Sequence, residues 1–168
     1  MFSAGGPEAS LEAVARTAGV GIGTLYRHFP TREALFQAVY SREVDEMVEL
    51  ARTLGEKPDP VDGLRCWLHS AVRMVATKRG MLTALAPAKT GAEEFYAGTS
   101  ARLRSAVSEL MARGVEAGRL REDVTPAEVL HAFLGICYAS DAPGWQETAA
   151  RLLDVFVDGL VAGEAETG

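Results

Sequence analysis

The stretch VARTAGVGIGTLYRHF, residues 14–29, decides the fold of this chain. It belongs to two short helical segments, residues 10–18 and 22–29, which a glycine-rich turn joins. Gly19 suits the left-handed position that ends a helix, and Pro30 ends the second segment because the residue before a proline avoids helical angles. Two short helices joined by a tight turn are typical of a helix-turn-helix unit, although a plain helical hairpin fits this pattern as well.

Outward from this unit, the sequence predicts further helices and no strands, because it contains no sustained alternation of apolar and polar residues. The segment TPAE at 125–128 is a capping box with proline at the first helical position, which is a specific helix start. Gly80 is expected to end a helix. The fold class is therefore all-α, with further helices expected at residues 32–53, 60–78, 81–86, 92–117, 126–139 and 145–162.

Charge is distributed unevenly along the chain. The first 42 residues hold four arginines and three glutamates, whereas the remainder holds 13 basic and 20 acidic residues, which gives the overall net charge of -6. The acidity therefore lies outside the helix-turn-helix segment. A local basic face remains available there for phosphate groups, although its net charge is small.

Composition and missing motifs argue against several classes of protein. Two cysteines, Cys66 and Cys137, are too few for a disulfide framework, and no stretch approaches the roughly 20 apolar residues of a membrane span. With no secretory signal at its start, the chain is expected in the cytoplasm and away from membranes. We expect no enzyme and no cofactor, because phosphate loops, nucleophile elbows and paired carboxylates are absent from the sequence. Cys66 and His69 form half of a metal site at most, and a thiol redox sensor is the other minor alternative.

Residues 14–29 and the following PTREAL at 30–35 closely resemble the signature of the TetR family of transcriptional regulators. The segments TKRGM at 77–81 and GVEAG at 114–118 resemble the SbtR-like regulatory domains of that family. The resemblance extends from about Phe2 onward. It implies a sequence-specific DNA-binding regulator, commonly a repressor that a small apolar ligand releases from a palindromic double-stranded operator.

The same resemblance implies a homodimer with two domains. Residues 1–50 would form the helix-turn-helix DNA-binding domain, and residues 51–168 would form the helical ligand-binding and dimerisation domain. The family has a complete helix before residue 10, of which residues 1–6 resemble only the last turn, so the first helix is expected to be largely missing. Two alternatives stay open: a native start upstream of Met1, or a shortened helical ligand-binding or interaction protein that binds DNA poorly.

The expected DNA contacts follow from the residue types and from the resemblance. Glycines in the turn allow the backbone to approach DNA closely, and Arg27 is the one long donor on the second helix. Tyr26 and His28 resemble the phosphate-contacting pair of the family, and Arg32 takes the place of its helix-four lysine. The expected DNA-contacting residues are Ser10, Gly21, Gly23, Thr24, Tyr26, Arg27, His28 and Arg32.

Two apolar sets are expected in the second domain. Large apolar residues between Pro60 and Gly118 either line a ligand cavity or form plain core; they are Trp67, Met74, Met81, Phe95, Tyr96 and Leu103. The segments 129–139 and 149–161 are apolar nearly all round, so a partner subunit is expected to cover them in a four-helix interface. The expected interface residues are Leu130, Phe133, Leu134, Leu152, Phe156 and Leu160.

Overall fold

The computed structural model describes residues 11–85 and 92–163, with the side chains of residues 81–85 and 92–94 left out. Within these residues the chain is built from helices and no strand, as the sequence predicts. The helices are α1 (Leu11–Ala18), α2 (Ile22–His28), α3 (Arg32–Gly55), α4 (Pro60–Leu85), α5 (Ala92–Glu116), α6 (Pro126–Tyr138) and α7 (Trp145–Leu160).

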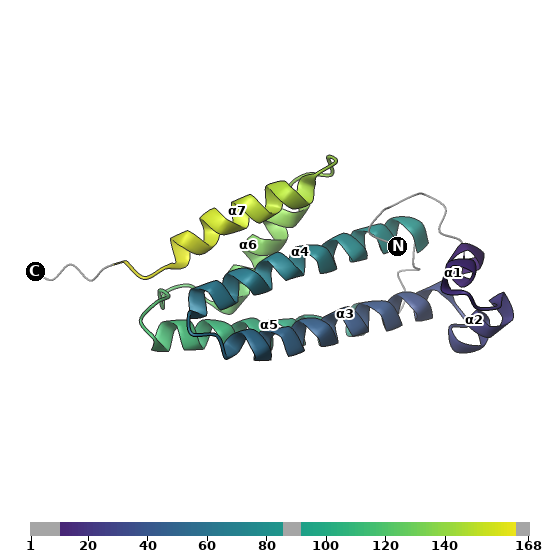
Figure 1. Ribbon diagram of the computed structural model, residues 1–168, viewed down its shortest axis with the longest axis horizontal. Helices are drawn as coiled ribbons and strands as arrows, with labels where there is room; N and C mark the ends of the chain where they lie inside the picture. Colours follow the sequence, from purple (N-terminus) through teal and green to yellow (C-terminus); the bar gives the residue numbers. More distant parts are fainter. Residues whose placement is uncertain (1–10, 86–91, 164–168) are drawn as a thin grey trace, which may run out of the picture.

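The long helices α3, α4 and α5 run along the length of the molecule, and α1 and α2 lie at one end of it (Figure 1). The pair α6 and α7 covers the other side of α4, which therefore lies in the middle of the body. No helix in the described ranges has the length and apolar character needed to cross a membrane.

Local sequence signals place the helix starts. The Thr31 hydroxyl accepts a hydrogen bond from the Ala34 N–H at 3.0 Å and so caps α3. The capping box at the start of α6 is complete: the Thr125 N–H donates to a Glu128 carboxylate oxygen at 2.7 Å, and the Glu128 N–H donates to the Thr125 hydroxyl at 3.3 Å. These bonds satisfy N–H groups that have no partner inside the helix.

The expected helix end at Gly80 is wrong, because α4 continues without a break to Leu85. A glycine inside a helix costs only about 1 kcal/mol relative to alanine. Tertiary contacts at this turn outweigh that cost: the Arg79 guanidinium donates to the Cys137 carbonyl at 2.9 Å and lies 4.4 Å from the centroid of the Trp145 ring. Arg79 thereby ties the last turns of α4 to α6 and to the start of α7.

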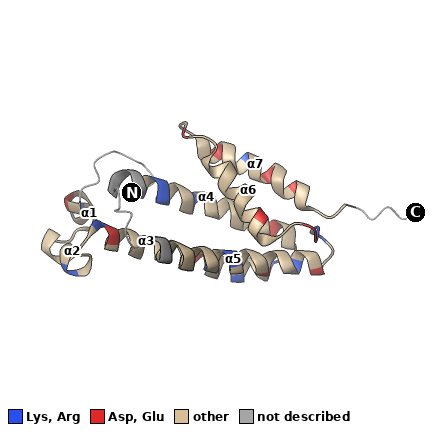
Figure 2. Ribbon diagram, turned by 180° about the vertical axis from the view of Figure 1, so that it is seen from behind, with Lys and Arg blue, Asp and Glu red and all other residues tan. Residues whose placement is uncertain are grey.

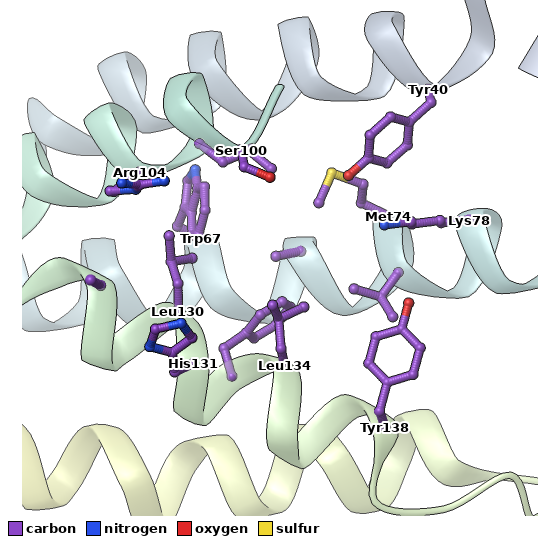
Figure 3. Close-up of a pocket in the computed structure, with 15 residues that line it drawn as sticks. Tyr40, Trp67, Met74, Lys78, Ser100, Arg104, Leu130, His131, Leu134 and Tyr138 are labelled. Carbon is purple, nitrogen blue, oxygen red and sulfur yellow. The ribbon is translucent and has the colours of Figure 1, made fainter. Parts of the chain in front are cut away.

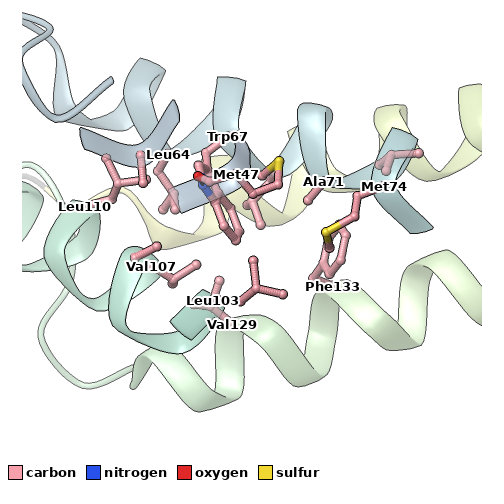
Figure 4. Close-up of a cluster of buried hydrophobic side chains, with 14 of the residues drawn as sticks. Met47, Leu64, Trp67, Ala71, Met74, Leu103, Val107, Leu110, Val129 and Phe133 are labelled. Atoms are coloured by element: carbon pink, nitrogen blue, oxygen red, sulfur yellow. Dashed lines mark hydrogen bonds between the residues drawn. The ribbon is translucent and has the colours of Figure 1, made fainter. Parts of the chain in front are cut away.

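The buried side chains form two clusters. The small cluster holds α1, α2 and the first turn of α3 together and consists of Leu11, Ala15, Leu25 and Leu35. The large cluster lies along α4 and includes the fully buried Leu64, Trp67 and Leu68. Figure 4 shows Leu64 and Trp67 within it. Val39 packs against both clusters. The expected domain boundary after residue 50 falls within α3, which runs unbroken from one cluster into the other.

Candidate functional site

The turn between α1 and α2 depends on Gly19, whose φ of 68° lies in the left-handed region. The Gly19 N–H donates to the Arg16 carbonyl at 3.2 Å, and the Val20 N–H donates to the Ala15 carbonyl at 3.0 Å. This pair of bonds is the Schellman arrangement that ends a helix with a sharp change of direction. The turn therefore fixes the angle at which α2, beginning at Ile22, leaves the small cluster.

One face of α2 is anchored and the opposite face is exposed. Leu25 is buried and Phe29 is half-buried in the small cluster. Tyr26 is 45% exposed, and Arg27 is exposed next to it. The Arg27 guanidinium donates to the Thr24 hydroxyl at 3.2 Å, so these two side chains lie together on the surface one turn apart. The helix presents a polar outer face supported by an apolar inner one.

Basic side chains gather at this end of the molecule. Arg16, Arg27, His28 and Arg32 are all exposed there. Figure 2 shows basic positions on α2 and at its junction with α3, with an acidic position on α1 and another in the first turn of α3, whereas acidic positions predominate along α7. The N-terminus of the 24-residue helix α3 adds partial positive charge beside Arg32. This end can attract the phosphates of a nucleic acid despite the net charge of -6.

The fold itself does not need the two glycines expected near DNA. Gly21 has a φ of -66°, which any residue adopts, and a Cβ there would meet only the Thr24 hydroxyl at 3.9 Å. A Cβ at Gly23 would meet nothing within 4 Å. Both glycines are exposed, so the space they leave faces outward. The expected contact at Ser10 lies outside the described residues.

A cavity of about 360 Å³ lies in the body between α3, α4, α5 and α6 (Figure 3). This volume is at the lower end of the range for small-molecule sites, roughly 300–1,000 Å³. Its walls are mostly apolar, with a few polar groups. It is lined by Tyr40 of α3, by Trp67, Ala71, Met74, Val75 and Lys78 of α4, by Ser100, Leu103 and Arg104 of α5, and by Ala127, Leu130, His131, Phe133, Leu134 and Tyr138 of α6.

The polar groups at one end of the cavity are a lysine between tyrosines. The Lys78 ammonium lies 5.2 Å from the centroid of the Tyr40 ring and 4.6 Å from that of Tyr96. Burial lowers the pKa of Lys78 below its ordinary value. Burial also raises the pKa of Tyr40 to about 12, to which the neighbouring Tyr138 and Tyr96 phenols add. The Tyr40 phenol therefore stays protonated and can donate a hydrogen bond.

Three of the residues expected at a ligand site, Trp67, Met74 and Leu103, line this cavity. Phe95 and Tyr96 do not line the cavity. They pack against Tyr40, and their ring centroids are 5.9 Å and 6.1 Å from that of Tyr40. The side chain of Met81 lies outside the described set. The sequence reasoning missed Lys78, although it falls four residues after Met74 and eleven after Trp67, on the same face of α4.

The outer faces of α6 and α7 carry exposed apolar side chains. Leu134 is 44% exposed and Leu152 is 46% exposed. Tyr138 and Val155, which lie in the two apolar segments but not in the expected interface set, are 48% and 70% exposed. Cβ atoms at Gly135 or Gly159, which are also exposed, would meet nothing within 4 Å. We call the surface formed by these six residues the α6–α7 face. Two of them, Leu134 and Tyr138, also line the cavity, so this face borders the cavity.

Two of the expected interface residues need correction. Phe133 and Leu160 are only 2% and 4% exposed because they pack into the large cluster of their own chain. Leu130 and Phe156 are half-buried against the same cluster. Helices that are apolar all round thus divide their surface between the protomer core and the outside, and only the outward residues are available to a partner.

The two cysteines and His69 form no reactive centre or metal site among the described residues. Burial raises the pKa of Cys137 to about 11, so the thiol stays protonated and unreactive even with Arg79 nearby. Cys66 lies 3.8 Å from an Asp62 carboxylate oxygen, whereas His69 pairs with Asp154 at 2.9 Å. Among the described residues, no three possible metal ligands gather at one place.

These features define a class of protein: an all-helical body with a partly open cavity and an outward apolar face, which carries an exposed helix-turn-helix at one end. The comparisons with known proteins agree with this class. Residues 1–39 match the family of bacterial regulatory proteins of the tetR type, and residues 59–162 match the C-terminal domain of SbtR-like transcriptional regulators. The chain belongs to the TetR family, a family of DNA-binding transcriptional regulators.

Solved structures extend the likeness over nearly the whole chain. A TetR transcriptional regulator from Streptomyces coelicolor is 37% identical, with a TM-score of 0.82, over 96% of this chain and 92% of that one. A TetR regulatory protein from Mycobacterium vanbaalenii is 32% identical, with a TM-score of 0.73, over 96% and 88%. A helix-turn-helix regulator of Staphylococcus aureus is 46% identical over 44 residues, which is 26% of this chain and only 23% of that relative.

Proposed function

We propose that this chain works in the cytoplasm as a homodimeric repressor, which a small ligand releases from a palindromic DNA operator. The observation that carries the proposal is the outer face of α2, where Thr24, Tyr26 and Arg27 are held outward by the buried Leu25. A short helix supported from behind and polar in front is the geometry that enters a major groove. Residues 1–50 would bind DNA, and residues 51–168 would hold the ligand and the partner subunit.

The α6–α7 face supports the dimer in this proposal. Exposed Leu134, Leu152 and Val155 would pack against the same residues of a second copy related by twofold symmetry. Gly135 and Gly159 leave room for the partner helices to approach closely. A four-helix interface of this kind would hold the two α2 helices at a fixed separation, and two half-sites one DNA turn apart need about 34–36 Å between them.

Helix α3 supports a direct link between the cavity and the DNA-binding end. Leu35 belongs to the small cluster behind α2, and Tyr40 lines the cavity five residues later. Five residues of helix span about 7.5 Å, so a ligand that moves Tyr40 also moves the base of α2. A ligand that binds a dimer with a different α2 separation more tightly would shift the population away from the DNA-binding form.

The replacement Arg27→Ala tests the assignment of α2. Operator affinity is expected to fall about 10-fold to 100-fold, because one arginine contact to a base contributes about 1–3 kcal/mol. The measurement is fluorescence anisotropy at several salt concentrations on a duplex that the unaltered protein selects from a random library. Thermal stability should not change, because the hydrogen bond of Arg27 to Thr24 lies on the surface.

The matched control is Arg119→Ala. Arg119 is also exposed but lies in the connection between α5 and α6, at the opposite end of the molecule from α2 (Figure 1). Its pairing with Asp59 at 3.4 Å is a surface contact of small value. Operator affinity is expected to survive this replacement. If Arg27→Ala and the unaltered protein had equal affinity and equal salt dependence, Arg27 on α2 would not contact DNA.

A further inference from the structure

Resting on the proposed function, we infer the chemical class of the effector: a small amphipathic carboxylate. Its charged group would bind Lys78 between the hydroxyls of Tyr40 and Tyr138, and its apolar body would lie along Met74 and Phe133 toward Trp67. The inference specifies the charge of the ligand, the end of the cavity at which the charge lies, and the kind of surface that the rest of the ligand buries.

The charge of the cavity wall is the first observation. The chain has 23 acidic and 17 basic residues, yet no aspartate or glutamate is among the described residues that line the cavity. Its charged or titratable side chains are Lys78, Arg104 and His131, besides the two tyrosines. A cavity of this composition favours an anion over a cation, because an apolar surrounding strengthens the attraction between opposite charges.

The state of Lys78 is the second observation. Its ammonium forms no ion pair with any residue that the structure describes, and its neighbours there are the ring faces of Tyr40 and Tyr96. A half-buried charge without an ionic partner loses hydration that the rings replace only in part. The lowered pKa of Lys78 has the same cause. An incoming carboxylate would supply the missing partner.

The position of the donors is the third observation. Figure 3 shows Tyr40 of α3 and Tyr138 of α6 on opposite sides of Lys78, with both hydroxyls directed into the space near the ammonium. The raised pKa of each tyrosine, caused first by burial, keeps both phenols protonated. Two O–H donors and one ammonium match the acceptor oxygens of one carboxylate, since bonds to a charged acceptor are the strong ones.

The polar groups at the other end of the cavity are weaker partners for a carboxylate. Arg104 and His131 are exposed to water, whereas Trp67 and Phe133 are buried. A carboxylate at the exposed end would gain little, because exposed pairs contribute less than about 1 kcal/mol. The structure therefore favours Lys78 as the partner of the ligand's charge.

The test uses four probes and the 168-residue chain without DNA. The probes are octanoate and 4-phenylbutyrate, each paired with the alcohol of the same carbon skeleton, and binding is measured by calorimetry. At least one acid is expected to bind ten times more tightly than its alcohol. Lys78→Met should remove that preference and leave alcohol binding in place, because methionine keeps the apolar stem. Lys78→Arg should retain most of the preference, and Arg104→Met should leave it unchanged.

Several outcomes would overturn the inference. These are equal or tighter binding of the alcohols, failure of both acids to bind at millimolar concentration, and a preference that survives Lys78→Met or disappears with Arg104→Met. A second measurement separates this result from the proposed function. Acids that bind through Lys78 without weakening the operator complex would contradict ligand-released repression, while the chemistry of the cavity would stand.

Discussion

Replacing Val155 by glutamate is expected to convert the dimer into monomers and to lower operator affinity at least 100-fold. Val155 is the most exposed large apolar side chain of the α6–α7 face, and in the proposed dimer twofold symmetry would bring two copies of it into one interface. Burying a carboxylate without a partner costs several kcal/mol. A monomer binds one half-site only and so loses the gain of about 10²–10⁴ that linked binding provides.

Light scattering after size exclusion and anisotropy on the selected duplex measure the two effects. Helix content should stay the same, because Val155 lies outside both buried clusters. Ala112→Glu is the matched control: Ala112 is an exposed residue of α5, away from the α6–α7 face, and both properties should survive its replacement. A Val155→Glu protein that stays dimeric would place the interface elsewhere.

The second large effect is on stability. Trp67→Ala is expected to lower the free energy of unfolding by about 3–5 kcal/mol, the usual cost of deleting a buried aromatic side chain. Trp67 is fully buried in the large cluster, and its indole N–H donates to the Met47 carbonyl at 2.9 Å, so the change also removes this buried hydrogen bond. For a domain of this size, Tm should fall by roughly 6–20 °C.

Thermal unfolding at one fixed protein concentration checks this effect, because the stability of a dimer depends on concentration. Trp67→Phe is the matched variant: it keeps most of the buried volume and loses the hydrogen bond, so its Tm should lie between those of the alanine variant and the unaltered protein. A Trp67→Ala protein within about 1 kcal/mol of the unaltered one would show that α4 is not the centre of the body.

Local signals explain which parts of the fold the sequence predicted well. Gly19, Pro30 and the capping box at 125–128 act on their own neighbours in the chain, and the helix bounds near them agree with the structure. The continuation of α4 past Gly80 depends on the contacts of Arg79 with α6 and α7, which no local pattern carries. An isolated glycine is therefore a weak signal for the end of a helix.

Some site residues could be placed from the helical period alone, whereas others depend on how the helices pack. The exposure of Tyr26 and Arg27 follows from the helical period, because Leu25 and Phe29 anchor the other face of α2. Adjacent Phe133 and Leu134 are both apolar, so the sequence did not show which one faces the core of its own chain. The place of Lys78 in the cavity requires the packing of α3, α5 and α6 around α4, which appears only in the folded chain.

Hydroxyl-radical footprinting on the selected duplex shows whether the two α2 helices of a dimer enter successive major grooves, as proposed. The expected footprint at low salt has two protected patches on one side of the duplex, about one helical turn apart, over sequences related by twofold symmetry. A single patch, two patches without this symmetry, or no protection at any salt concentration would contradict the account.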